Sequence, residues 1–186
     1  FLESLKLNLL EMTCDEHDRN MAVIQCLIHF SNLALGHALE KIAYDLEFAK
    51  KISVIGFDIS QKRVDLMKQG IDPSNELESK AFDHCDIIFT TSLEDLKEAK
   101  FFVVAVPTPV DEHNVPNLIP VQKASETIGK VIKKGDYVVF ESTVYPGCTE
   151  EDCLPIIEKL SGLSNLTDFK SGYSPERINP GDKVHT

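Results

Sequence analysis

The chain has 186 residues, 42% of them hydrophobic and 26% charged, which is the composition of a globular protein with its own core. Its 30 acidic and 19 basic residues give a formal net charge of −11, which argues against a nucleic-acid backbone or an anionic membrane as the main partner. No apolar run reaches about 18 residues, so no membrane-spanning helix is expected.

The first 50 residues have a helical pattern. They contain no proline and a single glycine, Gly36, and apolar residues recur at helical spacing from Met21 to Leu46. Thr13 is followed three residues later by Glu16, as in a capping box. This pattern predicts a short first helix and then one long or kinked helix from about residue 15 to residue 50.

After Lys51 short β-rich runs alternate with helical segments. The predicted strands are 52–58, 86–90, 101–106, 137–141 and 168–173, and the predicted helices are 61–69, 92–99, 121–133 and 149–160. Such alternation indicates βαβ units, a mainly parallel sheet and right-handed crossovers. The run 101–106 is entirely apolar, as expected of a strand that is covered on both faces.

Asp58 ends the first of these predicted strands. In a dinucleotide-binding fold an acid at this place accepts hydrogen bonds from the adenosine ribose, and Arg63 lies within reach of the same sugar. The alternative is an ordinary acid at a helix N-terminus and a solvated base. A glycine-rich loop is expected about 20 residues before such an acid, but residues 36–44 contain no G-x-G-x-x-G motif and follow no predicted strand.

The predicted fold class is therefore α/β. It is an incomplete Rossmann-like parallel sheet, with its first strand and glycine-rich loop missing, and an α-helical N-terminal segment precedes it. Without the first strand its two neighbours would lie about 9–10 Å apart, twice the usual spacing. The sheet must then close directly or borrow a replacement. We expect direct closure or a marginally stable fold, with the N-terminal helix packed on one face.

Three further side chains follow predicted strands. Thr108 lies between two prolines that fix the backbone, although a rigid turn alone explains them equally well. Thr143 could hold a catalytic water or a substrate oxygen, or it could cap the next helix. Glu176 could be the carboxylate partner of a reacting group, or simply a surface acid. Ligands of open α/β sheets bind beyond the carboxyl ends of the strands, so we expect these residues and Asp58 to surround one hollow.

The histidines and cysteines show no metal-ligand pattern, and no metal is expected. His17 and His29 are 12 residues apart on the predicted helix and share a face only loosely. The five cysteines are widely spaced and form no C-x-x-C motif. We expect structural thiols in a reducing, cytoplasmic compartment.

From about Ala43 to Thr186 the chain resembles the UDP-glucose/GDP-mannose dehydrogenase family. The resemblance is carried by VIGFDISQKRVD, VAVPTPVDEHNVPNL, KKGDYVVFESTVYPGCTEEDCLP and GYSPERINPGDKVHT. The branch it looks most like is that of the UDP-N-acetylhexosamine 6-dehydrogenases of bacterial surface-polysaccharide synthesis. The resemblance implies an NAD-dependent, two-step oxidation of the C6 alcohol of a UDP-sugar to a carboxylate.

The same resemblance implies roles for individual residues. It assigns cofactor binding to Asp58, Arg63, Thr108 and Thr143, catalysis to Thr143 and Glu176, and substrate binding to Glu176, Arg177 and Asn179. The family's glycine-rich loop is missing here, and its substrate lysine and nucleophilic cysteine would lie beyond Thr186. We therefore expect a fragment of an enzyme that is inactive alone.

Residues 8–41 resemble a different family, the C-terminal helical domain of the prephenate dehydrogenases of tyrosine biosynthesis. The motifs EHDRNMA and Q-x-L-x-H-F carry this likeness. It implies a helical domain at 1–42 joined to a truncated NAD-binding domain at 43–186, a possible homodimer, and His17 and His29 near a substrate pocket. The alternatives to an enzyme fragment are a non-catalytic dimerisation module and a prephenate dehydrogenase-related protein.

Overall fold

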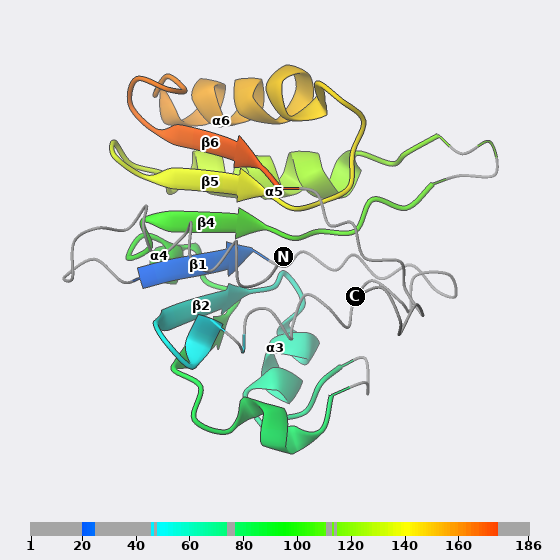
Figure 1. Ribbon diagram of the computed structural model, residues 1–186, viewed down its shortest axis with the longest axis vertical. Coiled ribbons are helices and arrows are strands. Elements are labelled where there is room, and N and C mark those ends of the chain that lie inside the picture. Colours follow the sequence, from blue (N-terminus) through cyan, green and yellow to red (C-terminus); the bar gives the residue numbers. More distant parts are fainter. Residues whose placement is uncertain are drawn as a thin grey trace.

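A six-stranded sheet with the order β3-β2-β1-β4-β5-β6 forms the centre of the protein (Figure 1). The structure is a computed structural model, and it describes residues 20–24 (backbone only), 46, 48–73, 77–110, 113 and 115–174. The strands are β1 (Asn20–Ile24), β2 (Ser53–Phe57), β3 (Ile87–Thr90), β4 (Phe101–Val104), β5 (Tyr137–Phe140) and β6 (Lys170–Tyr173). All neighbouring pairs run parallel, which confirms the predicted α/β fold.

Strand β1 corrects the sequence-based prediction. Ala22 pairs with Ile55 of β2 on one side and with Phe102 of β4 on the other. The predictions of a helix over these residues, of a missing first strand and of direct closure are therefore wrong. The run Asn-Met-Ala-Val-Ile is short and mostly apolar, and such a run fits a strand as well as a helix. Pairing on both edges decides the outcome, because only a strand satisfies the facing backbone groups of β2 and β4.

The remainder of the predicted helical segment is described only at its end, where Leu46, Phe48 and Ala49 are helical. Residues 1–19 and 25–45 lie outside the described part of the chain, and so do His17 and His29. The boundary near residue 42, the packing of an N-terminal helix on the sheet and the likeness to prephenate dehydrogenase thus stay predictions.

Helices follow the strands nearly where the alternating pattern predicts them. They are α3 (Gln61–Met67), η1 (Ser79–Phe82, a 3₁₀ turn), α4 (Leu93–Leu96), α5 (Ile119–Gly129), η2 (Thr149–Cys153, a π-helical turn) and α6 (Leu154–Ser161). Helices α5 and α6 pack closely at Gly129, where a Cβ atom would lie 2.9 Å from the Cβ of Leu160. No helix in the described ranges is long and apolar enough to span a bilayer.

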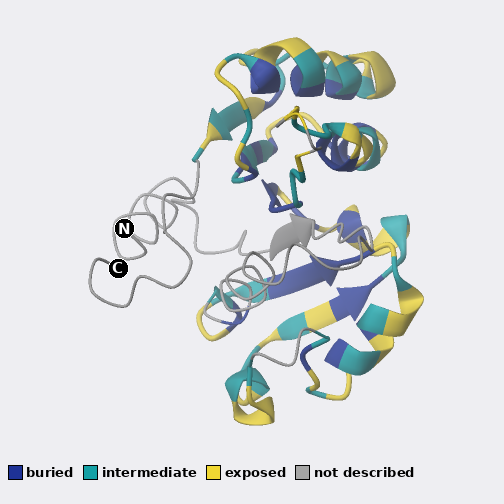
Figure 2. Ribbon diagram, turned by 90° about the vertical axis from the view of Figure 1, so that its right-hand side faces the viewer, coloured by how far each residue is buried: buried dark blue, intermediate teal, exposed yellow. Residues whose placement is uncertain are grey.

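Strand β4 is buried on both faces, as its apolar run predicts. Phe102 and Val104 belong to the larger core cluster, whereas Phe101 and Val103 belong to a second cluster formed with Val54. Figure 2 shows buried residues in the strands beside β1 and exposed residues on the outer sides of the helices, whereas the edge strand β6 is intermediate or exposed. Successive side chains of a strand point to opposite faces, so both clusters depend on the register of the central strands.

Replacing Val23 by proline tests whether β1 is the central strand. Proline has no N–H group for the ladder, and it is found in sheets essentially only at edges, strand starts and bulges. We expect a loss of about 3 kcal/mol, the order known for proline inside a helix, and a fall of the melting temperature by roughly 6–12 °C. Circular dichroism melts provide the measurement.

Val23→Ile is the matched control, because it keeps the N–H group and the β-branched side chain. Its melting temperature should stay within about 3 °C of the wild-type value. If Val23→Pro melts at the wild-type temperature, residues 20–24 do not form a central strand.

Candidate functional site

Asp58 lies at the carboxyl end of β2 and is fully buried. The Ser60 N–H donates to its Oδ1 at 2.7 Å, and the Arg63 Nε donates to its Oδ2 at 2.9 Å. Ser60 is the N-cap of α3, so the strand end, the turn and the first helical turn together hold the carboxylate. Asp58 is therefore fixed in place by its own local sequence.

Burial raises the pKa of Asp58, while the Ser60 N–H and the Arg63 guanidinium oppose the rise. The Nη2 atom of Arg63 is buried without a hydrogen-bond partner among the described residues. A carboxylate offers about four acceptor directions, and the two bonds to Asp58 leave others open. A ribose, with its two hydroxyl groups, can donate to such an acceptor and accept from a donor that has no partner in the described part of the chain.

The loops that follow β4 and β5 are joined by side-chain hydroxyl groups. The Oγ1 of Thr108 donates to the carbonyl oxygen of Thr143 at 2.6 Å. Ser142 is buried, and its Oγ accepts from the Val106 N–H at 3.0 Å and donates to the Val106 carbonyl at 2.7 Å. Thr108 and Thr143, both selected from the sequence, are thus brought together.

Thr143 itself is exposed, and its hydroxyl has no hydrogen-bond partner within the described ranges. The sequence-based reasoning missed two neighbours. One is Ser142, which the Glu-Ser-Thr run could have indicated, and the other is Tyr173, whose hydroxyl lies 3.4 Å from the nitrogen of Val144. The Thr143 side chain is therefore left available while the backbone around it is held.

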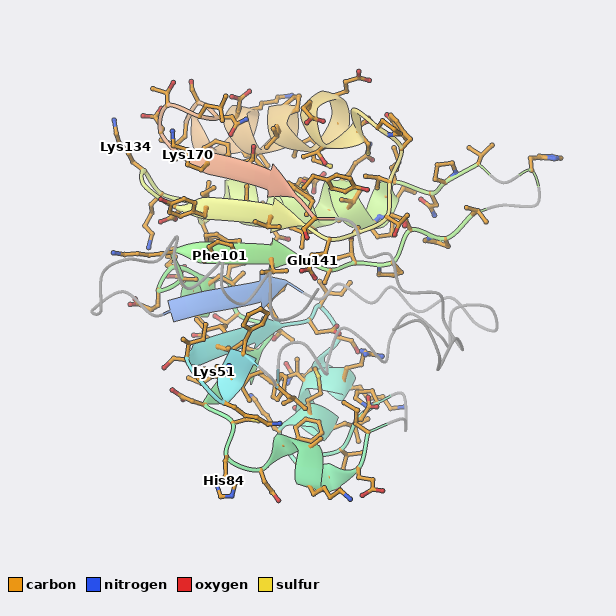
Figure 3. The ribbon with its side chains drawn as sticks, viewed as in Figure 1. Lys51, His84, Phe101, Lys134, Glu141 and Lys170 are labelled. Atoms are coloured by element: carbon orange, nitrogen blue, oxygen red, sulfur yellow. The ribbon has the colours of Figure 1, made fainter. Side chains whose placement is uncertain are left out.

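These groups share one edge of the sheet. Figure 3 shows Glu141 at the carboxyl end of the strands, with Lys134 and Lys170 at the opposite end. Asp58 follows β2, whereas Thr108 and Thr143 follow β4 and β5, so β1 lies between the two parts of the site.

The substrate residues predicted from the sequence, Glu176, Arg177 and Asn179, lie outside the described residues. Their roles, and the hollow expected around them, stay predictions. A groove of about 350 Å³ is found elsewhere, beside α3, η1 and β3, where Met67 and Phe82 line it.

The cysteines near this edge are buried thiols. Burial raises the pKa of both Cys148 and Cys153, that of Cys153 to about 12. Both therefore stay protonated at neutral pH, which suits structural rather than nucleophilic thiols. No group of three or more potential metal ligands occurs in the described part of the chain.

Known proteins resemble this chain over most of its length. The model of the NAD binding domain of the UDP-glucose/GDP-mannose dehydrogenase family matches residues 43–186. The chain is 56% identical over 141 residues to UDP-N-acetyl-D-glucosamine 6-dehydrogenase of Pseudomonas aeruginosa, covering 75% of this chain and 33% of that protein. It is 50% identical over 169 residues to Protein CapL of Staphylococcus aureus, covering 91% of this chain and 37% of that protein.

Among solved structures, UDP-D-ManNAc dehydrogenase from Pyrococcus horikoshii matches with a TM-score of 0.70 and 28% identity, covering 87% of this chain and 37% of that one. The chain thus spans about a third of the length of these relatives. The range 43–186 holds 144 residues, so the match to CapL over 169 residues also includes residues before 43.

The ion pair at the end of β2 makes a prediction about pH. Arg63 lowers the pKa of Asp58, so Arg63→Gln should raise that pKa further. Since the folded-state pKa lies above 3.8, the contribution of Asp58 to stability decreases as pH rises from 3.8 through the folded-state value. In Arg63→Gln the loss of stability with rising pH should be larger, and it should extend to higher pH.

Carbon NMR titration of the Asp58 carboxyl group measures the pKa directly. Lys62→Gln is the control, because it removes an equal charge from an exposed neighbour. An Asp58 pKa that is unchanged in Arg63→Gln would show that the ion pair does not form.

Ser142→Ala tests the hydroxyl contact between the two loops. The Val106 N–H and carbonyl would lose their partner in a buried place, at a cost of about 1–3 kcal/mol. Ser125→Ala is the control, because Ser125 is also buried but its hydroxyl donates to Val121 inside α5, where the helical bond remains. Denaturant unfolding measures the free energy of unfolding of both variants. If Ser142→Ala loses no more than Ser125→Ala, the contact between Ser142 and Val106 is not formed.

Proposed function

The chain belongs to the UDP-glucose/GDP-mannose dehydrogenase family, and we propose that it is part of an NAD-dependent dehydrogenase that oxidises the C6 alcohol of a UDP-N-acetylhexosamine to a carboxylate. The observation that carries the proposal is the buried Asp58 at the carboxyl end of β2, in a sheet of the order β3-β2-β1-β4-β5-β6. An acid at this place in such a sheet is the ribose-binding acid of NAD-binding domains.

At the adenosine end, the fit to the cofactor rests on Asp58 and Arg63. Asp58 accepts hydrogen bonds from the ribose hydroxyls, and the Nη2 of Arg63, which has no partner among the described residues, gains an acceptor. Between β1 and residue 46 the sequence holds only one glycine, Gly36, so it offers no glycine-rich turn for the pyrophosphate. We therefore expect this chain to bind NAD weakly and chiefly through the adenosine.

At the reacting end, bound NAD supplies a hydride acceptor, and Thr143 and Glu176 supply the polar groups. The exposed Thr143 side chain binds the reacting oxygen or a water molecule through its hydroxyl, and Thr108 holds the loop that presents it. Glu176 takes up or delivers the proton. Arg177 and Asn179 bind the sugar.

The proposed substrate follows from the relatives. They include UDP-N-acetyl-D-glucosamine 6-dehydrogenases of Pseudomonas aeruginosa and Salmonella typhi, at 56% and 48% identity. We assign the complete protein to polysaccharide biosynthesis in the cytoplasm, with a homodimer as its possible assembly. Chemistry on the sugar is proposed for the complete protein, because this chain spans only about a third of the length of these relatives.

Calorimetric titration with NAD⁺ and NADP⁺ tests the cofactor assignment. We expect a Kd of about 1 mM for NAD⁺, near −4 kcal/mol. NADP⁺ should bind at least about tenfold more weakly, because its 2′-phosphate would meet the Asp58 carboxylate. Asp58→Asn should reduce the difference in affinity between NAD⁺ and NADP⁺, since it removes the negative charge that the 2′-phosphate would meet.

Asp65→Asn is the control, because Asp65 is an exposed acid on the same helix. Two results would count against the proposal: no heat of binding with NAD⁺ at several millimolar, or equal affinity of the wild-type chain for both dinucleotides.

A further inference from the structure

The backbone next to the Thr143 side chain is bonded from both neighbouring strands. From the β4 side, the Thr108 hydroxyl donates to the Thr143 carbonyl at 2.6 Å. From the β6 side, the Tyr173 hydroxyl accepts from the Val144 N–H at 3.4 Å and donates to the Val144 carbonyl at 3.3 Å. Two consecutive carbonyls are thus held from opposite directions.

The end of β6 that carries Tyr173 is itself fixed. Tyr173 pairs with Phe140 in the parallel ladder, and the Ser174 N–H donates to the Phe140 carbonyl at 2.9 Å. The Tyr173 side chain starts from a backbone that is held in place, and it has only two χ angles about which it can rotate. The Tyr173 hydroxyl can therefore hold the loop after β5 in a fixed place relative to β6.

The hydroxyl of Tyr173 is placed to orient the loop more than to stabilise the fold. Tyr173 is 40% exposed, and its two contacts to Val144 are longer than the usual hydrogen-bond distances of about 2.5–3.2 Å. Loss of an exposed bond of this length costs the fold little. A small change in loop direction, by contrast, is costly where a reacting group must be held to within about 0.5 Å.

We propose that Tyr173 is a positioning residue that holds the Thr143–Val144 backbone so that the exposed Thr143 side chain faces the nicotinamide end of the bound cofactor. This inference rests on the proposed function. Tyr173 touches neither cofactor nor substrate in this account. It acts through Val144, whose N–H and carbonyl groups its hydroxyl contacts.

Comparing NAD⁺ with ADP-ribose tests this role in the full 186-residue chain, because ADP-ribose lacks the nicotinamide. In the wild-type chain NAD⁺ should bind more tightly than ADP-ribose. Tyr173→Phe should weaken NAD⁺ binding by about threefold to tenfold, the effect of roughly one lost hydrogen bond, and leave ADP-ribose binding unchanged. Tyr137→Phe is the control, because Tyr137 lies at the other end of β5, where its ring stacks on Phe101.

Amide hydrogen exchange gives a second readout that needs no ligand. The Val144 amide should exchange about threefold to tenfold faster in Tyr173→Phe than in the wild-type chain or in Tyr137→Phe. An unchanged exchange rate would overturn the proposal, and so would an equal loss of affinity for NAD⁺ and ADP-ribose, which indicates a general structural role.

The proposed function and this inference fail in different ways. If the wild-type chain binds neither NAD⁺ nor ADP-ribose, the cofactor assignment itself is wrong and the role of Tyr173 falls with it. If the wild-type chain prefers NAD⁺ and Tyr173→Phe keeps that preference in full, only the positioning role is wrong.

Discussion

The pairing of β1 on both of its edges is the constraint on which the rest of this structure depends. Asn20–Ile24 pairs with β2 on one side and with β4 on the other. Without it these two strands would lie about 9–10 Å apart, with facing backbone groups unpaired. In a sheet of this order the ligand crevice opens where the strand order reverses, next to β1. The same strand therefore completes the fold and separates Asp58 from the Thr108–Thr143 contact.

Most of the sheet could be predicted from local patterns, whereas its middle strand could not. The apolar run of β4 indicates burial on both faces, and two core clusters confirm it. Residues 20–24 lie inside a helical periodicity, and a short apolar run carries no local mark of the partners it will meet. Pairing between residues as far apart as Ala22 and Phe102 is a property of the whole sheet.

Part of the candidate site could also be predicted from the sequence, and part of it could not. Asp58, Thr108 and Thr143 follow strands in the sequence, and the structure places them at one edge of the sheet. Ser142 also follows a strand, and the Glu-Ser-Thr run could have indicated it. Tyr173 could not be found by that rule, because it lies within β6 and its partner is the backbone of another loop. Ser142 and Thr143 are neighbours in one loop with different surroundings: the Ser142 side chain is buried and hydrogen-bonded, and the Thr143 side chain is exposed.

The central claim is that residues 20–24 occupy the middle of the sheet. Amide–amide and amide–Hα nuclear Overhauser effects in a labelled chain test it most directly. The account predicts contacts from the backbone of Ala22 to both Ile55 and Phe102. Contacts between the backbones of β2 and β4, with none to residues 20–24, would show that the sheet has closed without this strand and would contradict the account.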